Sequence, residues 1–272
     1  MKMFSYYEHD SLLHRMNPAV KLAAVGLCLI LLTVVFDPFV PLVLLVGITV
    51  AARLAGGVPP LAMVKGLLPF TVLAFGFFWM QVVFPRGDAG DYTLATQVGS
   101  VPIYLETVLR GAALGLRVLC YAAFALLFVA TTDPTRLVLS LMQHARLSPR
   151  FGYSLLAAYR FFPLYHSEFM ILRAAHQVRG AEEGQGLRGR VGRLRRYAIP
   201  LLAGAVRRAE RVAIAMEARG FPGKTPRHYY TAVPIGAGDW LLGASLVAMT
   251  VGTALVAHRL GLLQLWDGSL YF

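Results

Sequence analysis

The segment Gly66–Phe84 reads GLLPFTVLAFGFFWMQVVF and contains nineteen consecutive residues without a charged side chain. A helix needs about 20 mostly apolar residues to cross the hydrocarbon core of a bilayer. The whole chain agrees with this signal, because 57% of its 272 residues are hydrophobic and only 15% are charged, against about 25% charged in soluble domains. A soluble fold of this length would lack the polar surface to cover itself. The sequence therefore predicts an all-α integral membrane protein.

Two shorter apolar segments precede this span. Leu22–Phe36 and Phe39–Ala52 carry no charge, and an Asp-Pro dipeptide separates them. Because proline biases the residue before it away from the helical conformation, the dipeptide predicts a tight turn between two helices. Lys21 and Arg53 stand at the two outer ends, where they are expected to snorkel and so lengthen both spans.

Two further spans follow a polar loop that we expect from residue 85 to about residue 104. Gly111–Thr132 contains one charge, Arg117, and Trp240–Ala257 contains none. An arginine is costly in hydrocarbon, so Arg117 either snorkels near the start of its helix or faces other protein. The sequence thus predicts about five transmembrane helices.

The net charge of +12 is concentrated in one third of the chain. Arg136–Arg227 holds seventeen Lys and Arg against five Asp and Glu, whereas the rest of the chain holds nine of each sign. Basic loops stay on the cytoplasmic side of a membrane. An even number of predicted spans separates this section from the N-terminus and from the segment between Arg53 and Lys65. We therefore expect a multi-pass protein of the cell membrane with its N-terminus in the cytoplasm.

Three parts are expected along the chain. Residues 1–132 form an N-terminal membrane part with four spans, residues 133–228 form cytoplasmic or interfacial helices, and residues 229–272 form the last span and tail. In the middle part, an Asp-Pro start at 133–134 predicts a first helix to about Arg146, followed by long helices from Phe151 to Val178 and from Val191 to Ala218. Residues 151–172 are apolar but interrupted by charges and a proline, which favours a membrane-surface or partly embedded helix over a span.

The two long helices end in the same kind of tripeptide. Val178-Arg179-Gly180 ends the first and Ala218-Arg219-Gly220 ends the second, forty residues later. An arginine in the last turn and a glycine after it are ordinary features of helix C-termini. Alternatively, both arginines are presented at helix tips to dock in a partner, since the planar guanidinium binds carboxylates and carbonyls in a fixed geometry. The residues alone leave both interpretations open.

Partial matches to nucleotide-binding and zinc-binding motifs do not predict such sites in this chain. Residues 184–189 match G-x-G-x-x-G, but they follow an amphipathic helix and not a strand. Residues 218–225 resemble a P-loop that lacks its first glycine. The seven histidines show no zinc-like spacing. We therefore expect no nucleotide site, no metal site, no cofactor and no catalytic residues. Attachment to the membrane explains the basic charge better than nucleic-acid binding does.

Five short motifs occur in the order found in one known family. The chain resembles the transmembrane T component of energy-coupling factor (ECF) transporters, the family that includes CbiQ-type cobalt-transport proteins. The matching segments are Ser11–Leu22 (SLLHRMNPAVKL), Thr131–Pro134 (TTDP), Tyr159–Pro163 (YRFFP), Ala174–Gly180 (AAHQVRG) and Met216–Phe221 (MEARGF). The departure is Val178, where the family more often has alanine or serine.

The resemblance implies a role for the two tripeptides. In this family the two x-R-G helix ends dock into grooves on two cytoplasmic ATPase subunits, and the long helices hold one small membrane protein that binds the vitamin or transition-metal ion. Val178, Arg179, Gly180, Ala218, Arg219 and Gly220 would then be the ATPase-docking residues. The chain would transmit force without being an enzyme, and a Gly-rich turn at residues 180–189 would let the long helices move.

Two other classes of function remain as alternatives. A stand-alone membrane carrier would show internal symmetry with broken helices at the midplane of the bilayer, and the sequence has no inverted repeat. An intramembrane enzyme would use Arg117, Arg160 or a histidine, and would be supported by paired acids or metal ligands within the spans. The sequence shows neither signal.

Overall fold

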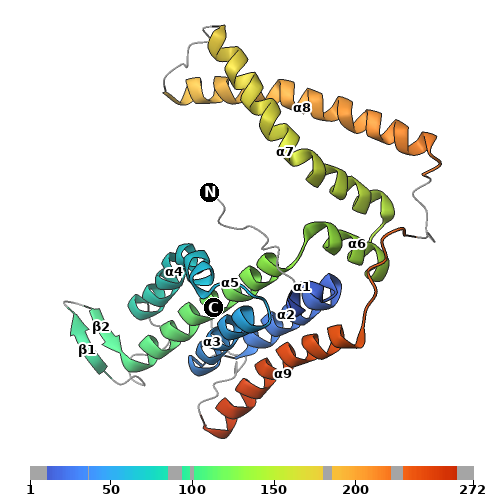
Figure 1. The fold of residues 1–272 in the computed structure, drawn as a ribbon. Coiled ribbons are helices and arrows are strands. Elements are labelled where there is room, and N and C mark those ends of the chain that lie inside the picture. The colour runs from blue at the N-terminus through green and yellow to red at the C-terminus, as the bar shows by residue number, and fades with distance from the viewer. Residues whose placement is uncertain are drawn as a thin grey trace. The chain divides into compact units, whose positions relative to one another are not determined.

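The computed structural model describes residues 11–35, 37–84, 94–98, 101–179, 186–221 and 229–261 (Figure 1). The chain divides into two compact units, which are described separately. Unit 1 contains residues 1–140 and 233–272, and unit 2 contains residues 141–232. In chain order, the described elements are α1 (Leu12–Arg15), α2 (Pro18–Val34), α3 (Phe39–Leu54), α4 (Pro60–Val83), β1 (Leu94–Val98), β2 (Val101–Tyr104), α5 (Leu105–Thr131), α6 (Pro134–His144), α7 (Pro149–Val178), α8 (Gly186–Ala218) and α9 (Ala237–Arg259).

The predicted helical fold class is confirmed, and each of the five apolar segments forms a helix. Two local differences from the prediction stand out. The segment expected to be a polar loop contains an antiparallel hairpin in which β1 pairs with β2, consistent with the β-branched residues it carries at 96, 98, 101 and 103. Helix α8 begins at Gly186, five residues before the expected start at Val191. Its basic and Gly-rich start is therefore helical as well.

Three of the helices, α4, α5 and α9, are long and apolar enough to cross a membrane. The apolar helices α2 and α3 are shorter, at roughly 25 Å each from the rise of an α-helix. α4 exposes large apolar side chains, among them Val72 at 76% and Phe75 at 62%. An apolar surface of this kind is unfavourable in water and suits a lipid environment. α7 is long, but it is not among the helices apolar enough to span.

In unit 1, α5 packs against α2, α3 and α4, and α9 packs against α2 and α3 (Figure 1). Two glycines in α5 allow its close approach to α4. A Cβ atom at Gly111 would lie 3.0 Å from the backbone oxygen of Phe78, and one at Gly115 would lie 3.1 Å from that of Ala74. Small residues at such spacing let two helix backbones approach where lipid supplies no hydrophobic driving force between helices.

Arg117 of α5 faces the protein, which was one of the two predicted placements. Its side chain is 8% exposed, and a terminal nitrogen of the guanidinium donates a hydrogen bond to the backbone oxygen of Val35. Val35 follows the last residue of α2, where a helix leaves carbonyl groups without intrahelical partners. The side chain of Arg117 therefore caps the C-terminal end of α2.

The expectation that Lys21 snorkels at the end of the first span is wrong. Its side chain is only 2% exposed. The ammonium donates to the backbone oxygens of Leu13 at 2.5 Å and Thr131 at 3.0 Å, and also contacts the hydroxyl groups of Thr131 and Thr132 at 3.1 and 3.3 Å. A buried charge persists only where such oxygens replace its water. Lys21 therefore joins the end of α1, the start of α2 and the end of α5.

We predict that Lys21→Met destabilises the protein, because it leaves the oxygens of Leu13 and Thr131 buried without a donor. Loss of a buried hydrogen-bond partner costs about 1–3 kcal/mol. The midpoint of thermal unfolding in detergent should therefore fall. The matched control is Lys65→Met on α4, where the lysine is exposed and the midpoint should not change. Equal midpoints for the two variants would contradict a structural role for Lys21.

Candidate docking site at two helix ends

Unit 2 is built around α7 and α8, and local sequence sets where α7 begins. Ser148 is its N-cap and accepts a hydrogen bond from the backbone N–H of Phe151, while Pro149 occupies the first helical position. Both residues suit these positions, because serine satisfies an unpaired N–H and proline lacks one. The segment Leu147–Arg150, expected to be a break, therefore also contains the start signal of the next helix. α7 then continues through Pro163 to Val178.

Ring contacts show that α7 and α8 run antiparallel. Near the start of α7, Tyr153 meets Phe221, just after α8, with ring centroids 5.5 Å apart. Near the end of α7, His176 meets Tyr197, in the first half of α8, at 5.4 Å. The C-terminus of α8 thus lies beside the N-terminus of α7. The two predicted docking ends are consequently not brought together but lie at opposite ends of the pair.

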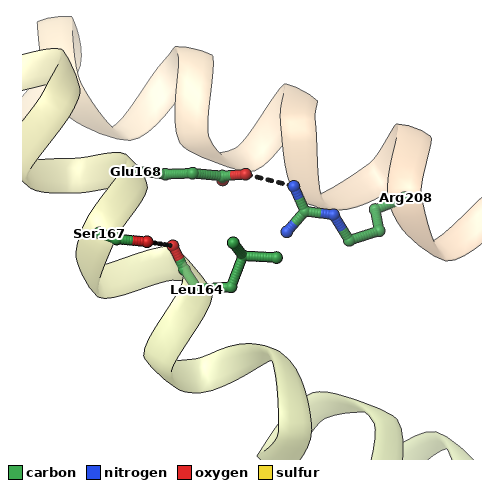
Figure 2. A network of polar contacts seen from close by, with 4 residues as sticks. All are labelled: Leu164, Ser167, Glu168 and Arg208. Atoms are coloured by element: carbon green, nitrogen blue, oxygen red, sulfur yellow. Dashed lines mark hydrogen bonds and ion pairs between the residues drawn. The ribbon is translucent and has the colours of Figure 1, made fainter.

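An ion pair joins the middle of the two helices. The guanidinium of Arg208 on α8 donates to the carboxylate of Glu168 on α7 (Figure 2). The same guanidinium lies 5.6 Å from the ring centroid of Phe161 and 5.3 Å from that of Tyr165, within the range of cation–π attraction. The hydrogen bond that Arg208 donates to Glu168 raises the pKa of Arg208 above its ordinary value, so the guanidinium stays charged at neutral pH.

Sequence reasoning missed this ion pair, because Glu168 and Arg208 are two charges among many in a basic section. Glu168 precedes Arg179 by eleven residues, and Arg208 precedes Arg219 by the same number. At about 1.5 Å per residue, each docking arginine lies roughly 16 Å along its helix from the ion pair. Since the helices are antiparallel, the two arginines extend in opposite directions from a shared centre.

The first docking end is fully presented to the surroundings. Val178 is 88% exposed, and Arg179 is exposed as well. The backbone N–H of Arg179 bonds to the oxygen of Ala175, which ends the helix without help from the arginine side chain. Gly180, the third predicted residue of this end, and residues 181–185 of the predicted Gly-rich turn lie outside the described residues.

At the second predicted docking end, backbone groups cap the helix. Gly220 adopts a φ of +69°, which glycine tolerates far better than other residues. Its N–H bonds to the oxygen of Glu217 at 2.9 Å, and that of Phe221 bonds to Met216 at 3.0 Å. This pair of bonds is the Schellman motif, which satisfies the last carbonyls of a helix. The cap therefore uses backbone groups alone, and the side chain of Arg219 is not needed for it.

The arginines of both helix ends are exposed. Ala218 and Arg219 are exposed, and no ion pair to Arg179 or Arg219 forms within the described part of the chain. Eleven residues separate each arginine from the ion pair, so the two ends lie roughly 33 Å apart along the helix pair at the helical rise. One groove of ordinary size would not hold both. The geometry suits two separate acceptor sites, each lined by carboxylates or carbonyls that a planar fork can bind.

No group of three or more histidine, cysteine or acidic side chains that could hold a metal ion occurs among the residues that the structure describes. The two cysteines, Cys28 and Cys120, are buried and unpaired. The candidate site therefore consists of two basic helix ends on the antiparallel pair α7 and α8.

Comparison with known proteins identifies the family. The sequence matches the family described as CbiQ, cobalt transport protein, over residues 9–230. The chain belongs to this family.

The relatives carry a more specific name. The chain is similar to the energy-coupling factor transporter transmembrane protein EcfT of Lactococcus lactis, with 26% identity over 92% of this chain and 96% of that protein. The EcfT proteins of Bacillus selenitireducens and Bacillus subtilis are 27% and 25% identical over 93% and 90% of this chain, and the matches cover 95% and 93% of those proteins. Together with the apolar helices, these similarities identify a multi-pass membrane protein and support the T component of an ECF transporter as its class.

We predict that reversing one charge of the central ion pair weakens the association of α7 with α8. Glu168→Arg would place two guanidiniums in contact, and the double variant Glu168→Arg with Arg208→Glu would restore an opposite pair. The association is measured with cysteines introduced at His176 and Tyr197 and a short bifunctional thiol crosslinker. The readout is the yield of chains crosslinked between these two positions. The yield should fall in the single variant and recover in the double variant.

The control for this experiment is Arg207→Glu, which reverses the charge of an exposed neighbour on α8. It should leave the crosslinking yield unchanged. A double variant no better crosslinked than the single one would show that the ion pair does not hold the two helices together.

Proposed function

We propose that this chain is the coupling subunit of an ATP-driven importer of the ECF type, which carries a vitamin or a transition-metal ion into a prokaryotic cell. The observation that supports this most strongly is the pair of exposed arginines at opposite ends of one antiparallel helix pair. Family membership over most of the chain supports it independently. The chain itself performs no catalysis in this proposal, because ATP is hydrolysed by its partners.

Two cytoplasmic ATPase subunits are the proposed partners of the helix ends. One binds the end formed by Val178, Arg179 and Gly180, and the other binds the end formed by Ala218, Arg219 and Gly220. The separation of roughly 33 Å along the helices supports two acceptors over one. When the ATPases close on ATP, the two ends move relative to each other, and the helix pair carries this motion toward the membrane.

A third partner, one small membrane protein that binds the cargo, would contact the apolar surface of the helix pair. α7 exposes Phe162 at 74% and Ile171 at 69%, and α8 exposes Leu194 at 67% and Leu202 at 64%. These side chains stand on helices that also carry many arginines. Such helices are suited to the membrane surface, where apolar side chains meet lipid or another membrane protein and basic groups meet water or headgroups.

The proposed topology has five spans, α2, α3, α4, α5 and α9, with the N-terminus and unit 2 in the cytoplasm. The concentration of basic residues in 136–227 supports this orientation. The three long apolar helices support three of the spans directly. For α2 and α3 the support is their apolar composition and the tight turn between them, where Asp37 accepts a hydrogen bond from the N–H of Val40 at 2.8 Å.

We predict that Arg179→Glu combined with Arg219→Glu removes the ATPases in a pull-down from solubilised membranes. Reversing both charges turns two guanidinium–acceptor contacts into repulsion, so the amount of bound ATPase should fall at least about tenfold, which corresponds to about 1.4 kcal/mol. The control is Arg173→Glu with Arg211→Glu, which reverses two exposed arginines inside the same helices. The docking assignment fails if both double variants bind ATPase equally.

Cysteine labelling tests the proposed topology. Leu54, at the end of α3, is 80% exposed, and Leu260, after α9, is 60% exposed. In the proposed arrangement, three spans separate them. A membrane-impermeant thiol reagent added to intact cells should therefore label Leu260→Cys and spare Leu54→Cys. Inverted vesicles should give the opposite pattern, and labelling of both positions from one side would refute the orientation.

A further inference from the structure

Arg146 has an unusual backbone conformation at the corner between α6 and α7. Its φ is +55°, and among the residues that the structure describes it is the only one other than glycine with a positive φ. A side chain in this left-handed region crowds the backbone, whereas glycine adopts it freely. The backbone N–H groups of Ala145 and Leu147 both donate to the oxygen of Leu141, at 3.0 and 3.2 Å. Glycine at position 146 would make the same turn without strain.

The end of α8 shows this usual solution. There Ala218-Arg219 is followed by Gly220, and the glycine takes the positive φ of +69°. At the end of α6, Ala145-Arg146 is followed by a leucine, and the arginine itself takes the left-handed conformation. A strained backbone position of this kind points to a use for the side chain that occupies it.

The Arg146 side chain has no polar partner inside the described part of the chain. It is exposed, and its guanidinium forms neither a hydrogen bond nor an ion pair with any described residue. One internal role remains, because a positive charge at the C-terminal end of α6 is favourable for the helix dipole. The alternative is that the guanidinium binds a partner, and substitution by glycine separates the two roles.

The corner that carries Arg146 lies at the second docking end. Met142, in the last turn of α6, packs on the first turn of α7, where a Cβ atom at Gly152 would overlap its side chain. The next residue, Tyr153, meets Phe221 with ring centroids 5.5 Å apart. Phe221 follows Arg219 by two residues. The end of α6, the start of α7 and the end of α8 therefore come together.

A hydrogen bond adds a second connection among the same parts. The side-chain amide of Gln143, in α6, donates to the backbone oxygen of Thr231 at 2.9 Å, ten residues beyond Phe221. All the residues that form this corner belong to unit 2. Arg146 and Arg219 are thus two exposed arginines at one end of the helix pair, and Arg179 stands at the other.

We propose that Arg146 is a third docking arginine and binds the same partner as Arg219. This inference rests on the proposed function and adds a residue to its second docking end. The acceptor surface on that ATPase subunit would carry carboxylates for two guanidiniums, since each planar fork binds a carboxylate in a fixed geometry. The ATPase subunit at the Val178 end makes no contact with Arg146.

Photo-crosslinking in solubilised membranes of the cells that express the full chain tests this assignment. A photo-crosslinking amino acid at Ala218 measures ATPase capture at the second end, and one at Val178 measures it at the first. Arg146→Gly should lower the yield at Ala218 at least about threefold, because a charge-assisted contact is lost. The yield at Val178 should not change. Arg146→Glu should lower the yield at Ala218 further through repulsion.

Thermal unfolding in detergent shows whether Arg146→Gly acts through the fold. Since glycine suits the left-handed backbone, the midpoint should stay the same or rise. The matched control is Arg211→Ala, which removes an exposed arginine inside α8 and should leave the yields at Ala218 and Val178 unchanged.

Three results would overturn the assignment. These are an unchanged yield at Ala218 in Arg146→Gly, an equal fall at Ala218 and Val178, and a lower unfolding midpoint, which would make Arg146 a structural residue of the α6 end. Failure of the proposed function looks different. In that case the chain with Arg146 intact would give no ATPase product at Ala218, and this inference would fall with it.

Discussion

The first turn of α2 carries the interactions on which the arrangement of this protein depends. Lys21 and Asn17 are both almost fully buried, and each is surrounded by oxygens or carbonyls from distant segments. Burial of such groups is unfavourable unless every hydrogen-bonding position is satisfied. The partners come from α1, α5, α6 and the segment before α9, so the two side chains join these segments.

The helix pair of unit 2 has its own internal contacts. The Glu168–Arg208 pair fixes the register of α7 against α8 (Figure 2), and the ring contacts of Tyr197 with Phe169 and His176 add to it. Each docking arginine then lies at a similar distance, roughly 16 Å, from the ion pair. The segments of α7 and α8 between the ion pair and each arginine have similar lengths. Equal displacements of two ATPases would therefore both be carried to the ion pair.

Much of this could be predicted from the sequence, because the signals are local. Apolar runs predict helices, and the Asp-Pro and Ser-Pro dipeptides mark turns and helix starts, as Asp37 and Ser148 confirm. The Arg-Gly pair at 219–220 predicts a helix end, and the φ of Gly220 agrees. Family resemblance, not physical chemistry, distinguished docking from ordinary capping. The structure adds that the cap at Gly220 uses backbone groups and not the side chain of Arg219.

What could not be predicted depends on partners far apart in the chain. Lys21 is a lysine at the end of an apolar segment, where a snorkelling side chain is expected. Only the proximity of Thr131 makes its burial favourable. Asn17 looks like a helix cap, which it is, but its contacts with Ser140 and Val233 involve residues more than a hundred positions away. Glu168 and Arg208 are two charges among many in a basic section. Local periodicity contains no information about any of these pairs.

The central claim is that the two helix ends bind two different ATPase subunits at once. Photo-crosslinking amino acids at Val178 and Ala218, which flank the docking arginines, test it directly in the assembled transporter. The account predicts that a chain carrying both substitutions gives a product with the mass of this chain plus two ATPase subunits, and that each single substitution gives a product with one. A doubly substituted chain that never captures more than one ATPase subunit would contradict the account.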